Sequence, residues 1–567
     1  MPKTRAQWRI YAFLVFLRIL IAFTSLSTIH PDEQFQNPEV AAALVFDYSE
    51  SGGVPLKTWE WQGGEPCRSV APLLISSGAA FSVVKLLGRD NPTAETLFAA
   101  QRAAMLLLSF VIDIVIYRLS SSFLSLFLFG SAPVTFAFLL RPFSNSLETV
   151  SLAVSLFCTS QVLSHKSRYL LPLGAVLAFG VWTRITFVAF AFPLVLAIVF
   201  RLMTDPPSVS HSFTLLKRGS PAVITFFSTA YLLVVLDTSY FRPELPLYYV
   251  ALHPSRLIIT PFNLLKYNLS SENLAQHGIH PRWLHAFVNL PMLYGVALTI
   301  VLSSISKVYA WRDQGEGNKD RKQVFWDRLL LASIFLPLAL LSIQPHQEPR
   351  FLLPLIVPLV LLAPRASFLT SFSNSRKRGA FWSLWILHSL LFTIFFGYLH
   401  QGGLVPTLFK LNRELRDSKS TVFGSHNVEL MFRKTFMAPR HLLLPLSDVQ
   451  VHPISSTRTV SIVDLGGVSE PELYTTLVSS LERVTSRTFL ISPSYLFDPS
   501  QTLLLSNPAK STTMKLCANA VPIDFDAWRP FSTDVHLDMD RLGEMVDSFT
   551  RRGLRGLKVA VLEILKC

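Results

Sequence analysis

The chain has 567 residues, of which 50% are apolar and only 16% are charged. Soluble domains carry roughly a quarter charged residues, so this composition excludes an ordinary soluble protein. The net charge of +14 would suit a nucleic-acid partner, but the basic residues gather in short loops between apolar runs, as the positive-inside rule requires. We therefore expect a polytopic membrane protein that is surrounded by lipid and binds no nucleic acid.

Apolar runs set the domain organisation, since one crossing of a bilayer takes roughly 20 residues. The sequence predicts an all-α membrane module of about 11 transmembrane helices over residues 1–400. Its runs lie at about 10–29, 99–117, 121–140, 146–164, 169–183, 185–201, 219–237, 286–305, 327–343, 350–364 and 381–399. Segment 71–87 is only moderately apolar and is expected to lie along the membrane interface.

The orientation follows from the basic residues. Lys3, Arg5 and Arg9 precede the first run, which puts its start in the cytoplasm. No small-residue cleavage site follows, so the run is interpreted as an uncleaved span. Loop 30–98 and the C-terminus then lie on the far side, which in a eukaryotic cell is the ER lumen. The Asn268-Leu269-Ser270 sequon falls in another luminal loop, where Asn268 is expected to be glycosylated.

Residues 401–567 contain no convincing span and are predicted to form a small luminal α/β domain. Segments 459–463 and 487–491 are typical of strands, and 472–484 is typical of an amphipathic helix. No catalytic motif is evident there, so a role in acceptor binding or stability is expected. One disulfide among the luminal Cys67, Cys517 and Cys567 is compatible with this topology, and the pairing is left open.

Two charged residues lie inside predicted spans, Arg18 in the first and Asp113 in the second. Their depths differ by only a few residues, at about 1.5 Å for each residue of a helix. Charges at such depth usually pair and face the interior of the helix bundle. We predict a structural ion pair.

An acidic loop, His30-Pro31-Asp32-Glu33, follows the first span directly. Acids before a helix often act only as caps. Two adjacent carboxylates beside a histidine at a membrane face are also a candidate site of chemistry. The sequence around the loop leaves both interpretations open.

Further polar motifs reach the same predicted face and mix acids with bases. The runs are Arg141-Pro142-Phe143-Ser144-Asn145-Ser146-Leu147-Glu148, the turn around Arg184, His277-Gly278-Ile279-His280-Pro281-Arg282, His346-Gln347-Glu348-Pro349-Arg350 and His400-Gln401-Gly402-Gly403. Each alone could be a cap or a solvated turn, and the arginines could simply snorkel. Together they indicate a site for an anion and a hydroxyl-rich partner. His277 and His280 are spaced i, i+3, but no carboxylate or Cys stands close by in sequence, so no metal site is expected.

Several of these motifs resemble glycosyltransferase family 22. The resemblance rests on His30-Pro31-Asp32-Glu33, on the Arg-x-Phe-Ser-Asn-Ser-x-Glu run and on the His-x-Glu-x-Arg-Phe run. The family consists of multi-spanning ER enzymes of the GT-C fold that use dolichyl-phosphate mannose. Gln34, where Tyr is common, and Pro349, where Ala is common, depart from its pattern.

Other stretches resemble the branch of the family that adds a fourth, α-1,2-linked mannose to a GPI precursor. They are Thr260-Pro261-Phe262-Asn263, the His277 to Arg282 run, Asn289-Leu290-Pro291, His346-Gln347-Glu348 and His400-Gln401-Gly402-Gly403. Siblings acting on N-glycans or on the third GPI mannose usually have Lys in place of Gln347. The resemblance therefore implies an inverting mannosyltransferase with two lipid-linked substrates, dolichyl-phosphate mannose and the GPI precursor.

The resemblance also implies residue roles. A phosphate leaves as a stable anion, so one carboxylate base suffices. Asp32 is expected to be that base, with Glu33 as runner-up or as a partner that orients His30 or a sugar hydroxyl. The candidates for binding the donor phosphate are Arg141, Arg184, His346 and Arg350. The candidates for binding the acceptor are Gln347, Glu348, His277, His280 and Asn263, whose groups suit sugar hydroxyls. No cofactor or metal is expected.

Three alternatives remain at this point. A sibling mannosyltransferase would share the acid loop and the donor. A lipid or solute transporter would show inverted repeats and Gly/Pro-broken spans with midplane charges, whereas the polar motifs here gather at one face. A non-catalytic subunit would leave the paired acids without a purpose.

Overall fold

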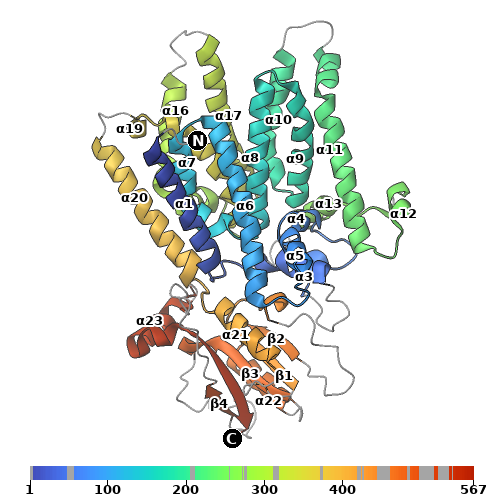
Figure 1. Cartoon of the computed structure of the whole chain (residues 1–567), viewed down its shortest axis with the longest axis vertical. Helices are drawn as coiled ribbons and strands as arrows, with labels where there is room; N and C mark the ends of the chain where they lie inside the picture. The colour runs from blue at the N-terminus through green and yellow to red at the C-terminus, as the bar shows by residue number, and fades with distance from the viewer. Residues whose placement is uncertain are drawn as a thin grey trace. The chain divides into compact units, whose positions relative to one another are not determined.

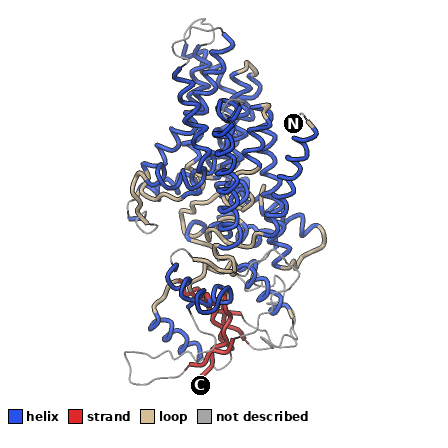
Figure 2. Tube along the Cα trace, turned by 90° about the vertical axis from the view of Figure 1, so that its left-hand side faces the viewer, coloured by secondary structure: helices blue, strands red, loops and turns tan. Residues whose placement is uncertain are grey.

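The computed structural model describes residues 4–46, 56–204, 211–253, 256–270, 272–273, 278–310, 318–370, 375–417, 423, 427–443, 460–481, 486–496, 516–520, 535–538 and 541–566. They form two compact units. The first comprises residues 1–19, 57–76 and 104–391, and the second comprises 20–56, 77–103 and 392–567. Helices dominate the first unit, and every described strand belongs to the second (Figures 1 and 2).

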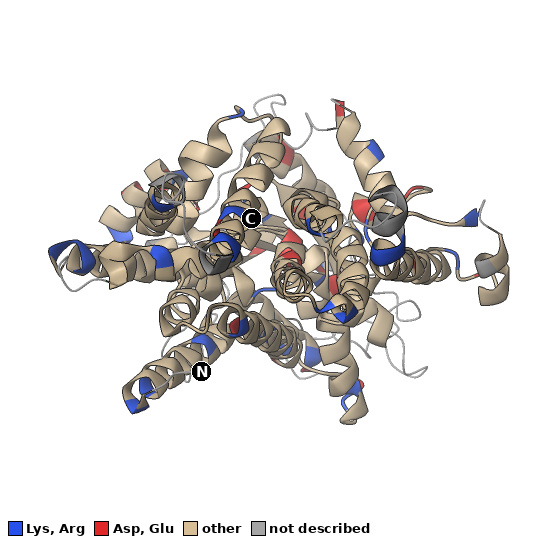
Figure 3. Cartoon of the chain, turned by 90° about the horizontal axis from the view of Figure 1, so that it is seen from above, with Lys and Arg blue, Asp and Glu red and all other residues tan. Residues whose placement is uncertain are grey.

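Long helices account for most of the first unit. Three of its helices, α1, α6 and α20, are shared with the second unit. The helices are α1 (Arg5–Thr24), α4 (Ala71–Leu74), α6 (Ala94–Ser120), α7 (Phe123–Gly130), α8 (Ser144–Leu163), α9 (Leu170–Thr183), α10 (Phe187–Thr204), α11 (His211–Phe241), α12 (Leu247–Leu252), α13 (Thr260–Leu269), α15 (Leu290–Tyr294), α16 (Leu298–Ala310), α17 (Asn318–Ile343), α18 (Ile356–Leu362), α19 (Ser367–Thr370) and α20 (Ser375–Ile394). In Figure 3 most residues of the helices are uncharged, and charged residues of both signs are scattered among them.

Among the described residues, eight helical segments are long and apolar enough to cross a membrane. They correspond to eight of the predicted runs, which confirms a multi-pass membrane protein. The other three runs form shorter or broken helices. Pro133 separates α7 from a π-helical turn at Thr135–Leu139, α9 ends before Arg184, and the 3₁₀ helix Pro349–Leu355 precedes α18. Proline removes a backbone donor and interrupts a regular helix at such points.

Small residues bring α9 and α11 together. A Cβ atom at Gly174 would lie 2.1 Å from the Ala222 carbonyl oxygen, so only glycine allows this close approach. Nearby, Trp182 of α9 packs with Leu233 and Val234 of α11. This packing fixes the end of α9, after which Arg184 follows.

The predicted ion pair between α1 and α6 is present. Arg18 donates from its two terminal nitrogens to the Asp113 carboxylate at 2.8 and 2.9 Å, and Tyr11 donates to the same group at 2.9 Å. Both charged side chains are buried. The Arg18 guanidinium also lies over the rings of Phe110 and Phe129. The pair is thus internal, as charges in an apolar medium require.

The second unit contains a five-stranded sheet of order β2-β1-β3-β5-β4. β1 is parallel to β2 and β3, while β5 is antiparallel to β3 and β4. The strands are β1 (Asn427–Arg433), β2 (Val460–Gly466), β3 (Ser486–Pro493), β4 (Leu516–Ala520) and β5 (Val559–Lys566), and the helices are α2 (Asp32–Phe35), α3 (Pro38–Phe46), α5 (Ser77–Leu86), α21 (Leu404–Arg416), α22 (Glu470–Leu481) and α23 (Leu542–Arg552). β2, α22 and β3 match the predicted strand, helix and strand.

One apolar cluster holds α22 on this sheet. Leu473 and Leu477 of α22 pack against Met431, Leu490 and Leu562 from three strands. The sequence did not reveal β1, β4 or β5. Cys67 is a free thiol in the first unit, while Cys567 lies outside the described residues. The last three residues of the predicted helix 472–484 also lie outside them.

Candidate functional site

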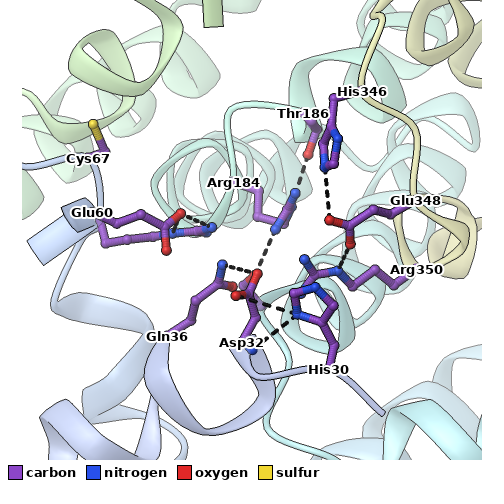
Figure 4. Close-up of polar contacts among 12 residues, drawn as sticks. His30, Asp32, Gln36, Glu60, Cys67, Arg184, Thr186, His346, Glu348 and Arg350 are labelled. Carbon is purple, nitrogen blue, oxygen red and sulfur yellow. Dashed lines mark hydrogen bonds and ion pairs between the residues drawn. The ribbon is translucent and has the colours of Figure 1, made fainter. Parts of the chain in front are cut away.

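The acidic loop begins α2 in the second unit. The N-cap position is Pro31, which makes no side-chain cap. Asp32 is partly exposed, at 24% of its side chain, and it accepts a hydrogen bond from the Gln36 amide at 2.5 Å. His30 lies beside it, with Nδ1 3.5 Å from Oδ1 of Asp32 and accepting from the Asp32 backbone N–H at 3.2 Å (Figure 4). The Asp32 carboxylate is therefore held by Gln36, lies beside His30 and is still reachable.

Glu33 has the opposite environment. Its side chain is fully buried and forms an ion pair of 2.8 Å with Arg102 of α6, which is also fully buried. Gln34 donates to Glu33 at 3.4 Å and accepts from Gln101 at 3.2 Å. Gln34, where relatives in the family commonly have Tyr, thus belongs to this buried polar network. The structure gives the two adjacent acids different environments, one accessible and one internal.

Arg184 is the centre of a group in the first unit, at the turn between α9 and α10. It donates to Ser144 at 2.9 Å and to Thr186 at 3.2 Å, and it lies 3.7 Å from the Glu148 carboxylate of α8 (Figure 4). Thr186 donates to Glu148 at 2.8 Å. Burial and then the positive charge of Arg68 lower the pKa of Arg184 to about 10. Arg184 and Glu148 are both buried, so this group pairs opposite charges largely away from solvent.

A second group comes from the turn between α17 and α18. His346 donates from Nε2 to Glu348 at 2.9 Å, and Arg350 donates to the same carboxylate (Figure 4). Burial alone would lower the pKa of His346, but the hydrogen bond to Glu348 and the charge of Glu348 outweigh burial and raise it. The Phe351 ring lies 5.0 Å from the Arg184 guanidinium and 5.9 Å from that of Arg350. Two of the three predicted phosphate-binding arginines therefore lie beside one aromatic ring.

Gln347 is buried, and its side chain forms hydrogen bonds with backbone groups. Its carbonyl oxygen accepts from the His285 N–H at 2.9 Å, and its amide donates to the carbonyls of Ser342 and Gln344 at 3.2 and 3.1 Å. His280 accepts from the Gln347 N–H at 3.2 Å. These contacts tie the start of the α15 region to the turn that carries His346 and Glu348. Gln347 thus holds two loops together, and its contact with the acceptor stays a prediction.

The remaining predicted residues have varied positions. Arg141 is fully buried, and its Nε donates to the Ala137 carbonyl at 2.7 Å. Asn263 donates to the Pro66 carbonyl at 2.9 Å, which attaches α13 to segment 57–76. Asn268 is half-buried in α13. His277 lies outside the described residues.

Sequence reasoning missed three charged residues of these groups. Arg102 pairs with Glu33, and Arg68 pairs with Glu60 at 2.6 Å in a largely buried contact. Asp237 of α11 is fully buried and accepts three hydrogen bonds. A charge inside or beside an apolar run is the signal that could have found Arg102 and Asp237. Within the described part of the chain, no cluster of three or more His, Cys, Asp or Glu side chains could hold a metal ion.

The fold resembles that of a solved membrane protein. A crystal structure of ArnT from Cupriavidus metallidurans bound to undecaprenyl phosphate superimposes with a TM-score of 0.52 and 11% sequence identity, covering 99% of this chain and 98% of that one. Its apo form gives a TM-score of 0.50 and covers 86% of this chain and 93% of that one, also at 11% identity. At these identities the likeness concerns the fold.

Sequence similarity gives the family. Residues 9–445 match the model of the Alg9-like mannosyltransferase family, and the chain belongs to that family. GPI mannosyltransferase 4 of Emericella nidulans is 35% identical over 71% of this chain and 69% of its own length. The human GPI alpha-1,2-mannosyltransferase 4 is 31% identical over 84% of this chain and 81% of its own length.

Proposed function

We propose that this protein transfers the fourth, α-1,2-linked mannose from dolichyl-phosphate mannose to the third mannose of a GPI precursor at the luminal face of the ER membrane. The observation that carries the proposal is its similarity to relatives named GPI mannosyltransferase 4 over most of the chain. We infer the donor from the family resemblance, and we infer the luminal location of the reaction from the predicted topology.

Asp32 is the general base of this proposal, and the contrast with Glu33 supports it. A base must be reachable by the acceptor hydroxyl and must be ionised. Asp32 is partly exposed, whereas Glu33 is buried and already paired with Arg102. Asp32 takes the proton of the 2-hydroxyl while that oxygen bonds to C1 of the donor mannose. The bond from C1 to the phosphate oxygen breaks in the same displacement, which converts a β linkage into an α linkage.

The arginine groups serve the leaving phosphate. Arg184 and Arg350 present buried guanidinium groups, which bind phosphate oxygens more strongly than solvated ones. His346, whose raised pKa favours its protonated form, adds a further positive charge. Dolichyl phosphate departs as a stable anion, so no general acid is needed. A monophosphate also gathers less charge than a nucleotide diphosphate, and we expect transfer without an added metal.

Depletion of the protein tests the reaction. We expect cells without it to accumulate a GPI precursor with three mannoses in its main chain, identified by mass spectrometry. A two-mannose precursor would move the assignment to the third-mannose sibling, and truncated dolichol-linked N-glycans would move it to the N-glycan branch. A full-length GPI glycan at normal levels would contradict any mannosyltransferase role in this pathway.

The base is tested by restoring depleted cells with Asp32→Asn, which keeps the size of the side chain and removes its basicity. Loss of a general base costs on the order of 10²- to 10⁴-fold in rate, while protein abundance should stay normal because Asp32 is partly exposed. Asp90→Asn, at an exposed acid, is the matched control. Wild-type transfer by Asp32→Asn would reject Asp32 as the base.

A further inference from the structure

Arg68 is a buried arginine that uses only part of its guanidinium group in hydrogen bonds. Its Nε and Nη2 both donate to a single oxygen of Glu60, at 2.8 and 2.6 Å. The side chain is 9% exposed, and its Nη1 is buried without a hydrogen-bond partner among the residues that the structure describes. Leaving a buried N–H unpaired is costly, more so on a charged group, and such a group calls for an explanation.

Arg68 belongs to the same charged group as Arg184. Its charge is the largest influence after burial on the pKa of Arg184, and Arg350 acts in the same direction. Arg68 also interacts electrostatically with Glu148. Gathering buried guanidinium groups costs free energy unless anions balance them. The carboxylates Glu60 and Glu148 supply that balance in the structure described here.

The chain around Arg68 is fixed in place. Asp237 of α11 accepts hydrogen bonds from the Ser69 hydroxyl and the Val70 N–H, both at 2.9 Å, and from the Thr260 hydroxyl at 2.8 Å. Asp237 is fully buried. The two residues that follow Arg68 are thus attached to a long helix and to the start of α13. A guanidinium on so constrained a segment is preorganised for a ligand.

We propose that Arg68 is a further phosphate-binding residue, which acts with Arg184 on the phosphate of a lipid-linked substrate and uses its free Nη1 edge for that contact. The identity of the lipid rests on the proposed function. Glu60 is then a resident counter-ion that competes with the phosphate for Arg68. Arginine suits this role because its planar fork matches phosphate oxygens.

Binding of dolichyl phosphate to the purified full-length protein in detergent tests the site without any transfer reaction. Dolichyl phosphate should raise the thermal unfolding temperature of the wild type, and dolichol, which lacks the phosphate, should not. Arg68→Gln should weaken the apparent affinity on the order of 10- to 100-fold, the range for a charge-assisted hydrogen bond. Arg89→Gln, at an exposed arginine, should leave it unchanged.

Glu60→Gln separates a binding role from a structural one. It keeps an oxygen for Arg68 and removes the competing charge, so the affinity for dolichyl phosphate should rise. A purely structural pair predicts lower stability for both variants and equal affinity, which would overturn the proposal. If Arg68→Gln does not fold, Arg68→Lys decides: weaker binding supports the site and unchanged binding rejects it.

Kinetics then identify the substrate that carries the phosphate. A higher KM for dolichyl-phosphate mannose in Arg68→Gln assigns the site to the donor, and a higher KM for the GPI precursor assigns it to the phosphate of the acceptor. Unchanged values of both constants would overturn the proposal. If the wild type transfers no mannose but binds dolichyl phosphate through Arg68, the proposed function fails while the phosphate site stands.

Discussion

The buried pair of Glu33 and Arg102 offers a sharp test of how the two adjacent acids differ. Glu33→Gln preserves shape and hydrogen bonding but leaves the Arg102 guanidinium without the carboxylate that balances its charge. Both side chains are fully buried at a separation of 2.8 Å. Removing one partner of such a pair typically costs about 3–5 kcal/mol. Set against a total stability of about 5–15 kcal/mol, that loss should markedly reduce the amount of folded protein.

The assay compares membrane abundance and thermal unfolding temperature for the wild type, Glu33→Gln, Asp32→Asn and the double variant Glu33→Gln/Arg102→Met. We expect Glu33→Gln to be scarce and less stable, and the double variant to recover part of the loss because no buried charge remains unbalanced. Asp32→Asn should match the wild type in both measurements. A Glu33→Gln protein of normal abundance and stability that transfers no mannose would refute this reasoning and make Glu33 the chemical base.

Three further predictions concern other parts of the chain. Asp113→Leu should destabilise the protein by about 3–5 kcal/mol, and adding Arg18→Leu should restore much of that; equal stability of the two variants would contradict a coupled pair. Because Glu348 raises the pKa of His346 above 6.5, the stability from this contact is complete below pH 6.5 and is lost as the pH rises through the folded-state pKa. Unfolding temperatures measured across this range should show that decline in the wild type and not in His346→Gln. A C-terminal tag should resist protease in sealed microsomes until detergent is added, and its cleavage in intact vesicles would reject the predicted topology. As a second test of that topology, Asn268→Gln should lower the electrophoretic mass by the size of one glycan.

Features that depend on local pattern and on the bilayer could be predicted from the sequence. Apolar length locates the eight long membrane helices, because a span must satisfy its backbone hydrogen bonds internally over a fixed thickness. Depth along two helices was enough to pair Arg18 with Asp113. Alternating and helical periodicity found β2, α22 and β3. The acid loop was also visible, since a polar motif directly after a span stands out from its surroundings.

The surroundings of each charged side chain depend on the tertiary structure. Asp32 and Glu33 are neighbours in the chain, yet Arg102, 69 residues beyond Glu33, fixes one of them inside the protein. The Gln347 side chain forms hydrogen bonds with backbone groups of two separate segments. Arg68 lies in a segment that is hydrogen-bonded to Asp237. The burial and ion pairing of a charged side chain depend on which distant segments lie next to it, and helix packing determines those neighbours. Local hydropathy does not predict these long-range contacts. The different roles of the adjacent Asp32 and Glu33 could therefore be distinguished only in the folded structure.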